Sequence, residues 1–333
     1  MREDPVMKAQ RMITVLERLL EQNWAVFIWG APGTGKSSIV REVAASRGLE
    51  VRDLRASLLD PTDLRGIPMI HDGKAQWCPP VFLPGPDEKP GVLFLDEINA
   101  AAPLVQAGMY QLVLDRRVGE YELPAGWKII AAGNRKEDRA VTFRLSSALA
   151  NRFIHLNLDV DAGDWQNWAL AHNVHPVVRA FLHVRHELLY SRAPDEAAFA
   201  SPRSWEMASD VIRDFGSCQA AADVLPGIIG SGPAIELGTF ERNADVAAEL
   251  EAILADPEGA PVPEALDRLW ALVSFMGGRG KEETVRRAAG KLLKRLPADF
   301  AVVLARDILK VHPAFVRNPG YLTFMRAHGE YFA

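Results

Sequence analysis

Residues 25–37 read AVFIWGAPGTGKS, and this stretch decides the fold. Val26–Trp29 is a short apolar run typical of a buried strand, Gly30–Ser37 has the spacing G-x-x-x-x-G-K-S, and Ser38–Arg47 has the apolar pattern of a helix. In this order, the glycines let the backbone fold around an anion, so that successive N–H groups and the positive end of the helix point at a β-phosphate. The stretch therefore predicts a nucleotide-binding loop.

The side chains of this loop fit the same function. Lys36 can reach the β- and γ-phosphates, and Ser37 places a hydroxyl where Mg²⁺ needs an oxygen ligand. The four fixed positions arise by chance in roughly one chain in a hundred of this length, and the flanking strand and helix lower that frequency. The predicted nucleotide contacts are Gly30, Ala31, Pro32, Gly33, Thr34, Gly35, Lys36, Ser37 and Ser38.

Two further strand ends carry polar residues suited to phosphate chemistry. Val92–Leu95 is an apolar strand followed by Asp96, which can hold Mg²⁺, and Glu97, which can polarise an attacking water. Lys128–Ala132 predicts another buried strand, and Asn134 after it can orient the same water. Acidic pairs after strands are common, and an Asn after Gly also suits a turn, so both interpretations depend on the phosphate loop upstream.

Composition predicts an ordinary globular chain. The 333 residues are 48% hydrophobic and 24% charged, which fits one large or two moderate domains. The net charge of −5 and a pI near 5.9 give no overall attraction to nucleic acid or to anionic membranes. Cys78 and Cys218 form no paired metal motif, and the sequence has neither a signal-peptide core nor an apolar run of ~20 residues. We therefore expect a cytoplasmic protein that does not enter a membrane.

The predicted organisation changes near residue 158. Before it, strands alternate with helical or irregular segments, which predicts an α/β fold with a mainly parallel sheet. The expected strands are Val26–Trp29, Val51–Leu54, Val92–Leu95, Lys128–Ala132 and Phe153–Leu158. After it, the expected helices are Trp165–Ala171, Val177–Tyr190, Ser204–Phe215, Val246–Leu254, Pro263–Phe275, Glu282–Leu296 and Phe300–Val311. Breaks are predicted at Gly232-Pro233 and Asp256–Pro263.

The three strand ends together resemble the signature of the AAA+ ATPases, and the finer details resemble the MoxR family within the helix-2-insert group. The blocks that carry this resemblance are GAPGTGKS at Gly30–Ser37, DPTDLRGIP at Asp60–Pro68, LDEIN at Leu95–Asn99, AAGNR at Ala131–Arg135 and ALANRF at Ala148–Phe153. The resemblance implies a five-stranded αβα domain over residues 1–158, a helical lid over 159–240, and a helical C-terminal extension over 241–333.

The same resemblance implies a function. It indicates Mg²⁺-dependent hydrolysis of ATP in a ring that is usually hexameric, coupled to chaperone-like remodelling of a protein client. It also implies, as a frequent partner, a protein with a von Willebrand factor A domain.

Two arginines receive catalytic roles from the resemblance. Arg152 matches the arginine finger, which stabilises the transition state in a neighbouring subunit, although an Arg after the short predicted helix 145–151 is also favoured by the helix dipole. Residues 201–202 read as an N-cap and first helical residue, so Arg203 lies in a first turn, where a cation is disfavoured. Arg203 matches the lid arginine called sensor 2, which contacts the γ-phosphate in cis; pairing with Glu206 is the alternative.

Two hairpins are expected to face a central pore or a client. Gly66–Pro80 has Asp72-Gly73 between β-compatible runs, and Arg117–Leu123 resembles the hairpin that precedes the Asn134 strand. At least half of the apolar side chains on these hairpins are expected to pack within the chain. The candidate client contacts are Met69, Ile70, Trp77 and Tyr121.

Two other classes of function stay open. A nucleic-acid motor is possible because helix-2-insert relatives include helicases, and the predicted helix Glu282–Leu296 has a basic face, although such a face is more often simply solvated. The acidic pI and the lack of a separate DNA-binding domain argue against it. The third class is a nucleotide-dependent scaffold with vestigial hydrolysis, which the presence of Glu97, Asn134 and Arg152 opposes.

Overall fold

The computed structural model describes residues 5–135, 138, 143, 145–192 and 197–328. The chain divides into two compact units, Met1–Val160 and Asp161–Ala333. The first unit ends two residues beyond the predicted boundary at residue 158. A further division at residue 240, into a lid and an extension, stays a prediction.

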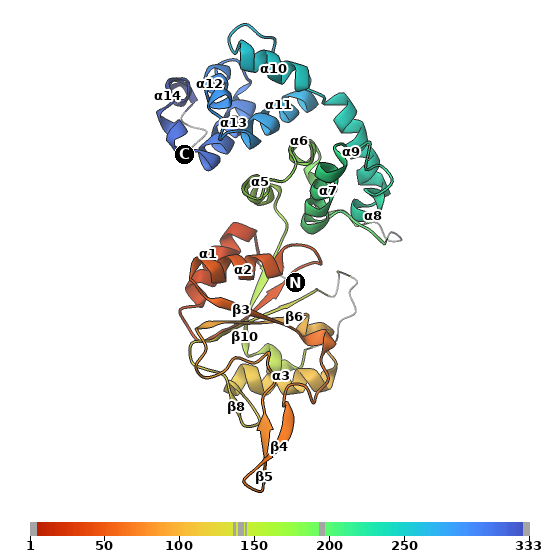
Figure 1. Cartoon of the computed structure of the whole chain (residues 1–333), viewed down its shortest axis with the longest axis vertical. Coiled ribbons are helices and arrows are strands. Elements are labelled where there is room, and N and C mark those ends of the chain that lie inside the picture. The colour runs from red at the N-terminus through yellow and green to blue at the C-terminus, as the bar shows by residue number, and fades with distance from the viewer. Residues whose placement is uncertain (1–4, 136–137, 139–142, 144, 193–196, 329–333) are drawn as a thin grey trace. The chain divides into compact units, whose positions relative to one another are not determined.

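The first unit contains a six-stranded sheet in which every strand is parallel to its neighbours (Figure 1). In spatial order its strands are β1 (Val6–Met7), β10 (Phe153–Leu158), β2 (Ala25–Trp29), β9 (Lys128–Gly133), β6 (Gly91–Asp96) and β3 (Glu50–Arg55). The five predicted strands are confirmed to within one residue at each end. The predicted number of strands was wrong, because β1 pairs with the edge of β10. A run of two residues is too short to show the alternation of a strand in the sequence. Val6 and Met7 form a strand because they pair with the unpaired backbone N–H and C=O groups of β10.

Helices cover both faces of this sheet. α1 (Ala9–Leu19) and α2 (Lys36–Ser46) lie on one face, and α3 (Pro103–Asp115) and α4 (Ser147–Ala150) belong to the other, so the unit has three layers (Figure 1). Alternation along β2 shows why: Val26 and Ile28 pack with the α1 and α2 side chains, whereas Ala25 and Phe27 pack with those of α3 and α4. The predicted αβα architecture is therefore confirmed.

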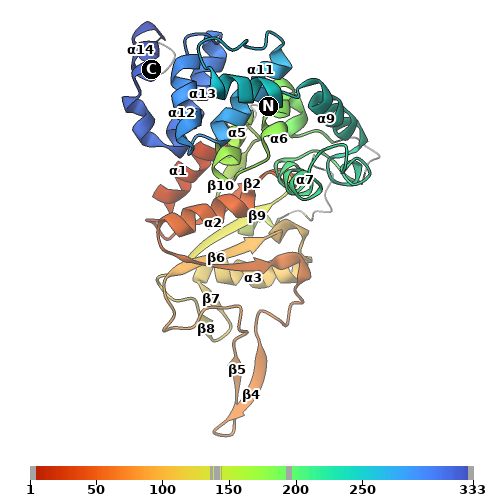
Figure 2. The same cartoon turned by 45° about the horizontal axis from the view of Figure 1, so that its top comes forward.

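Both predicted hairpins are present in the first unit. β4 (Ile67–His71) pairs antiparallel with β5 (Lys74–Cys78), and β7 (Arg117–Val118) pairs with β8 (Tyr121–Glu122). The residues of the first turn, Asp72 and Gly73, have φ of 50° and 74°, as a tight hairpin turn requires. Figure 2 shows the β4–β5 hairpin projecting beyond α3, which exposes much of its surface to solvent.

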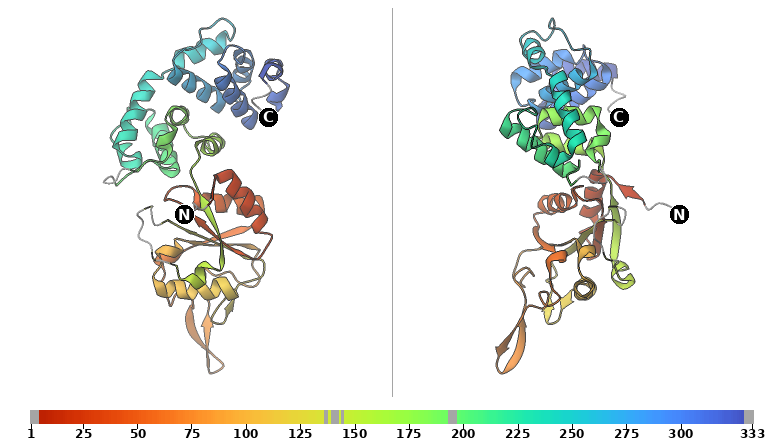
Figure 3. Two further views of the ribbon diagram at one scale, coloured as in Figure 1. Left: turned by 180° about the vertical axis from the view of Figure 1, so that it is seen from behind. Right: turned by 90° about the vertical axis from the view of Figure 1, so that its right-hand side faces the viewer.

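The second unit is helical in its described residues, apart from one bridge between Ser191 and Ala200 (Figure 3). None of its helices, nor any other described helix, is both long and apolar enough to cross a bilayer. The longer helices are α5 (Ala162–Ala171), α6 (Pro176–Val184), α7 (Pro202–Phe215), α9 (Ser231–Asn243), α10 (Ala247–Ala255), α11 (Leu266–Gly278), α12 (Glu283–Leu292), α13 (Ala298–Val311) and α14 (Pro319–His328). Short turns of helix connect some of them: α8 (Pro226–Ile229) and the 3₁₀ segments η4 (His186–Leu189) and η5 (Pro313–Arg317).

Two predictions in this unit were wrong. The helix expected over Val177–Tyr190 ends at Val184, because Arg185 leaves the helical region and pairs with carboxylates, including one on α9, a tertiary contact that periodicity does not show. The break expected at Gly232-Pro233 lies inside the first turn of α9. Proline is tolerated there because the N–H groups of a first turn have no acceptor within the helix.

His183 on α6 makes the stability of this unit depend on pH. Its ring stacks on Trp270 of α11 with the centroids 4.3 Å apart, and its Nε2 is buried without a hydrogen-bond partner among the described residues. Burial, and then the charges of Arg179 and Arg306, lower the pKa of His183 to about 3. This pKa is below 6.5, the value of a histidine in the unfolded chain. Above pH 6.5 the ring is neutral in both states, and the contribution of His183 to the free energy of unfolding is fully present. That contribution is lost as the pH falls towards 3, because the unfolded chain then binds a proton that the folded chain does not.

We therefore expect acid to lower the melting temperature of the parent protein between pH 6.5 and 4. The contribution of His183 to the free energy of unfolding should fall by up to about 1.4 kcal/mol per pH unit. His183→Phe keeps an aromatic ring against Trp270 and should flatten the pH profile, whereas His186→Gln changes an exposed histidine and should not. Melting curves at several pH values test this, and an unchanged slope in the His183→Phe protein would contradict it.

Candidate active site

The loop Gly30–Ser37 joins the carboxyl end of β2 to the first turn of α2. The helix begins at Lys36, two residues before the predicted start at Ser38, because Gly35 acts as its N-cap with a left-handed φ of 92°. A Cβ atom built on Gly35 would meet nothing within 4 Å, so the space beside the loop is open. The loop thus has an open approach to the amino end of a helix, where anions are favoured.

Lys36 is the buried cation of the loop. Its ammonium group donates to the carbonyl oxygens of Gly30 at 2.6 Å and Ala31 at 3.0 Å, and to Oδ1 of Asn134 at 3.0 Å. These three acceptors are oxygens at the loop and at the end of β9, and a phosphate placed there would add a charge-assisted hydrogen bond to the ammonium group. The surroundings of Lys36 therefore fit a phosphate group of a nucleotide.

Ser37 and Asp96 form an oxygen pair beside this cation. The Ser37 hydroxyl donates to Oδ2 of Asp96 at 3.2 Å. Burial raises the pKa of the Asp96 carboxyl group, and the negative charge of Asp53 on the neighbouring strand β3 raises it further. A carboxylate disfavoured in this way is stabilised by a divalent cation, and hydroxyl and carboxylate oxygens are ligands that Mg²⁺ prefers. The two predicted metal ligands are thus adjacent and fit Mg²⁺.

Glu97 is exposed directly after the same strand end. It has a left-handed φ of 55°, which is uncommon for a residue other than glycine and typical of functional sites. Ser57, in the turn that follows β3, donates from its hydroxyl to Oε2 of Glu97 at 2.6 Å. Sequence reasoning missed Ser57, because only the pairing of β3 with β6 places it beside Glu97.

Asn134 is held by a second asparagine that the sequence analysis gave no role. Asn99 is buried, and its Nδ2 donates to the backbone oxygen of Asn134 at 2.7 Å. A Cβ atom on Gly133 would lie 2.3 Å from Oδ1 of Asn99, so a glycine is needed at that position. The sequence analysis used the block Leu95–Asn99 but gave no role to its last residue. The signal that could have identified Asn99 was a polar side chain two positions after the acidic pair.

Arg152 lies away from the phosphate loop of its own chain. It is exposed between α4 and β10, next to Phe153, which pairs in parallel with Ala25 at the start of β2. The loop follows the other end of β2, and five strand residues span roughly 15 Å. Arg152 therefore lies at the amino ends of the strands and the loop at their carboxyl ends, which are opposite edges of the sheet. The structure does not bring them together within one chain.

A hydrogen-bonded histidine connects these two edges. Trp29, the residue before the loop, donates from Nε1 to Nδ1 of His155 at 2.9 Å, and Nε2 of His155 lies 2.8 Å from the carbonyl oxygen of Ala150. Because a carbonyl only accepts, His155 carries its proton on Nε2. The chain Trp29, His155, Ala150 thus joins the residue before the loop to the last residue of α4, two positions before Arg152. Sequence reasoning did not find this connection.

Arg203 belongs to the second unit. Ser201 caps α7 and forms a reciprocal capping box with Ser204, which confirms that Arg203 lies in the first turn. The side chain of Arg203 is exposed, and it makes no ion pair with Glu206, although both residues are described. Its role at the γ-phosphate stays a prediction.

Comparison with known proteins finds a family similar to most of the first unit. Residues 25–155 match the family described as "ATPase family associated with various cellular activities (AAA)". No curated protein matches the sequence. Among solved structures, a RuvB variant from Thermotoga maritima is 17% identical, with 81% of each chain covered and a TM-score of 0.41. NtrX from Brucella abortus in complex with ATP is 12% identical, covering 97% of this chain and 67% of its own, with a TM-score of 0.43. Both likenesses are too distant to bear on function.

Proposed function

We propose that this protein, whose residues 25–155 match a family of AAA ATPases, hydrolyses ATP with Mg²⁺ in a ring of identical subunits and uses the energy to remodel a protein client. One observation carries the ATPase proposal. Lys36, Ser37, Asp96 and Asn134 converge at the carboxyl ends of the neighbouring strands β2, β9 and β6, with hydrogen bonds between them. This edge of a parallel sheet is where ligands of α/β proteins bind.

The residues of this edge divide the chemistry among them. The loop N–H groups and Lys36 would bind the phosphates, while Ser37 and Asp96 would hold Mg²⁺, which offsets charge on the phosphate oxygens. Glu97 would accept a proton from the attacking water, and its carboxylate has acceptor sites left for that water while Oε2 accepts from Ser57. When Lys36 turns to phosphate, Oδ1 of Asn134 becomes free to orient the same water.

The opposite-edge position of Arg152 supports assembly. An arginine about 15 Å from its own loop has no role there, but it can reach the loop of a neighbour packed against the edge where it lies. We therefore propose that Arg152 completes the site of the adjacent subunit. A hexamer is the number of subunits that the MoxR resemblance implies.

The protein client and its partner rest on the MoxR resemblance and on the β4–β5 hairpin. This hairpin exposes Met69 and Ile70 to solvent by 58% and 85% of their surfaces, and the neighbouring Ile67 is 71% exposed, so apolar surface gathers on it. Trp77 is half-buried beneath the guanidinium group of Arg65, and the Tyr121 hydroxyl donates to a backbone oxygen at 2.8 Å, so these two are packing residues. We propose that Met69 and Ile70 contact the client, and that a protein with a von Willebrand factor A domain is the partner.

Replacing Lys36 tests the ATPase proposal. In the Lys36→Ala protein we expect ATP binding to weaken by about 100-fold and phosphate release to disappear, because a charged hydrogen bond to phosphate is lost. Lys89→Ala, which changes an exposed lysine, should match the parent. Binding of a fluorescent ATP analogue and phosphate release give the two readouts. Tight ATP binding by the parent without turnover would favour the scaffold alternative, and stimulation of hydrolysis by DNA would favour the motor.

A further inference from the structure

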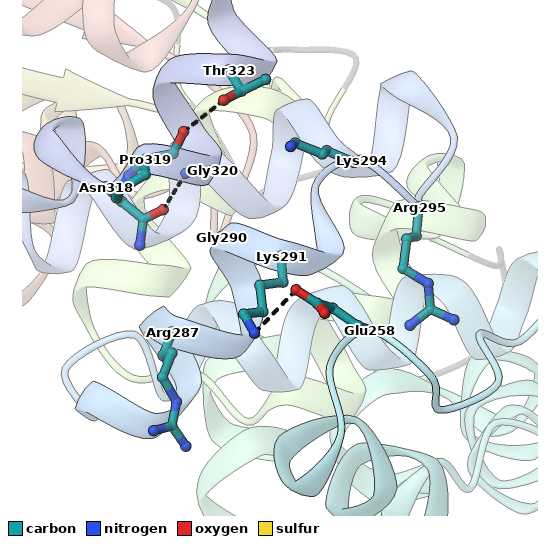
Figure 4. A pocket seen from close by; sticks show the side chains of 10 residues that line it. All are labelled: Glu258, Arg287, Gly290, Lys291, Lys294, Arg295, Asn318, Pro319, Gly320 and Thr323. Carbon is teal, nitrogen blue, oxygen red and sulfur yellow. Dashed lines mark hydrogen bonds and ion pairs between the residues drawn. The ribbon is translucent and has the colours of Figure 1, made fainter.

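The second unit contains a cavity of about 510 Å³ between α12 and α14 (Figure 4). Its volume falls in the range of small-molecule sites, which is about 300 to 1,000 Å³. Among its lining residues are four cations and one carboxylate: Arg287, Lys291, Lys294, Arg295 and Glu258. This excess of positive charge stands out in a chain whose net charge is −5.

Three of the cations share one side of α12 and its continuation. Arg287, Lys291 and Lys294 follow the spacing i, i+4, i+7, which places them in a row on one helical face, and all three are exposed. Lys291 pairs with Glu258 at 3.1 Å, whereas Arg287 and Lys294 make no ion pair with any described residue. Among the residues that the structure describes, Arg295 donates to the backbone oxygens of Pro257 and Ala260 and makes no ion pair. The carboxylate of Glu258 thus balances one of the four charges.

The shape of the cavity is fixed by a backbone contact between its two helices. A Cβ atom on Gly320 would lie 1.8 Å from the carbonyl oxygen of Gly290, and a Cβ atom on Gly290 would lie 2.2 Å from Oδ1 of Asn318. That oxygen accepts from the N–H of Gly320 at 2.9 Å and of Tyr321 at 3.3 Å, which caps the first turn of α14. The basic row on α12 is therefore held beside the positive end of a second helix.

We propose that this cavity binds a small anion that carries two or more phosphate groups. Arg287, Lys291 and Lys294 all line the cavity, and a small anion with several charges can offer more than one of them a charged partner. Guanidinium and ammonium groups both suit phosphate oxygens. A nucleic acid fits less well, because the lining residues include no aromatic ring on which a base could stack. The proposal does not depend on hydrolysis of ATP by the first unit.

Calorimetric titration with inorganic triphosphate tests the proposal. The titrations use full-length protein with Lys36→Ala, which weakens binding at the phosphate loop. In that background, Arg287→Gln with Lys294→Gln should lower the affinity by about tenfold or more, since two charge-assisted contacts are removed. Glu258→Gln should raise the affinity, because it frees Lys291. The matched control, Arg11→Gln with Lys281→Gln, removes two exposed charges elsewhere and should leave the affinity unchanged.

Two results would overturn the proposal. One is a triphosphate affinity that does not respond to the changes at Arg287 and Lys294, in variants whose melting temperature equals that of the background protein. The other is preferential binding of a single-stranded oligonucleotide or of a polyglutamate peptide, with triphosphate failing to compete. A parent protein that fails to hydrolyse ATP would refute the proposed function and leave this binding result intact.

Discussion

A Glu97→Gln protein is expected to bind ATP with Mg²⁺ and to turn it over about 10²- to 10⁴-fold more slowly than the parent. The amide keeps the size and the hydrogen-bonding reach of the carboxylate, and it can still accept from the Ser57 hydroxyl. It cannot take a proton from the attacking water. Equilibrium binding of ATP and single-turnover phosphate release measure the two effects separately.

The control for this change is Glu42→Gln, which alters an exposed carboxylate on α2 and should leave both quantities at the parental value. Parental turnover in the Glu97→Gln protein would remove Glu97 from the mechanism. If it holds ATP as expected, the same variant can serve as bait in lysate from the native source, with Lys36→Ala as the empty control. ATP-dependent capture of a protein with a von Willebrand factor A domain would support the proposed partner, and capture of replication proteins would favour a nucleic-acid motor.

Arg152→Ala is expected to lower the rate of hydrolysis by about 10³- to 10⁵-fold while leaving ATP binding nearly unchanged. The arginine lies at the sheet edge opposite to its own loop. If it serves a neighbouring subunit as proposed, its loss should remove charge stabilisation from that neighbour's site. Mixing two inactive proteins tests this directly. A subunit with Arg152→Ala has an intact loop, and a subunit with Lys36→Ala has an intact arginine, so mixed assemblies should regain part of the activity.

The control for Arg152→Ala is Arg18→Ala, an exposed arginine on α1, which should keep the parental rate. All variants are compared at the same oligomeric state by light scattering. Parental turnover in the Arg152→Ala protein, or mixed assemblies that stay inactive, would refute the assignment of Arg152.

Features with a local pattern could be predicted from the sequence. The strand before the loop alternates between two cores, with Val26 and Ile28 on one face and Phe27 on the other, and such runs are visible without a structure. The polar residues at the strand ends follow directly from the strands themselves. For this reason the αβα layers were predicted correctly. Lys36, Ser37 and Asp96 lie close together, and their roles stay predictions.

Features that depend on distant parts of the chain could not be predicted in this way. Ser57 and Glu97 are 40 residues apart in sequence, and Trp29 and His155 are 126 apart. Each pair meets only because two strands are neighbours in the sheet. The sixth strand has the same cause, since Val6 and Met7 become a strand only where β10 offers an edge.

Because Arg152 is separated from the loop at Gly30–Ser37, the number of complete sites depends on how the subunits are arranged. If each copy supplies its arginine to the next copy's loop, an open row of subunits always has an unused arginine at one end and an incomplete loop at the other. Such head-to-tail contacts satisfy every copy only when the row closes on itself. Specific activity should then rise with protein concentration and reach a plateau at the concentration where the rings are closed. Dilution alone would lower the activity, because it opens the rings.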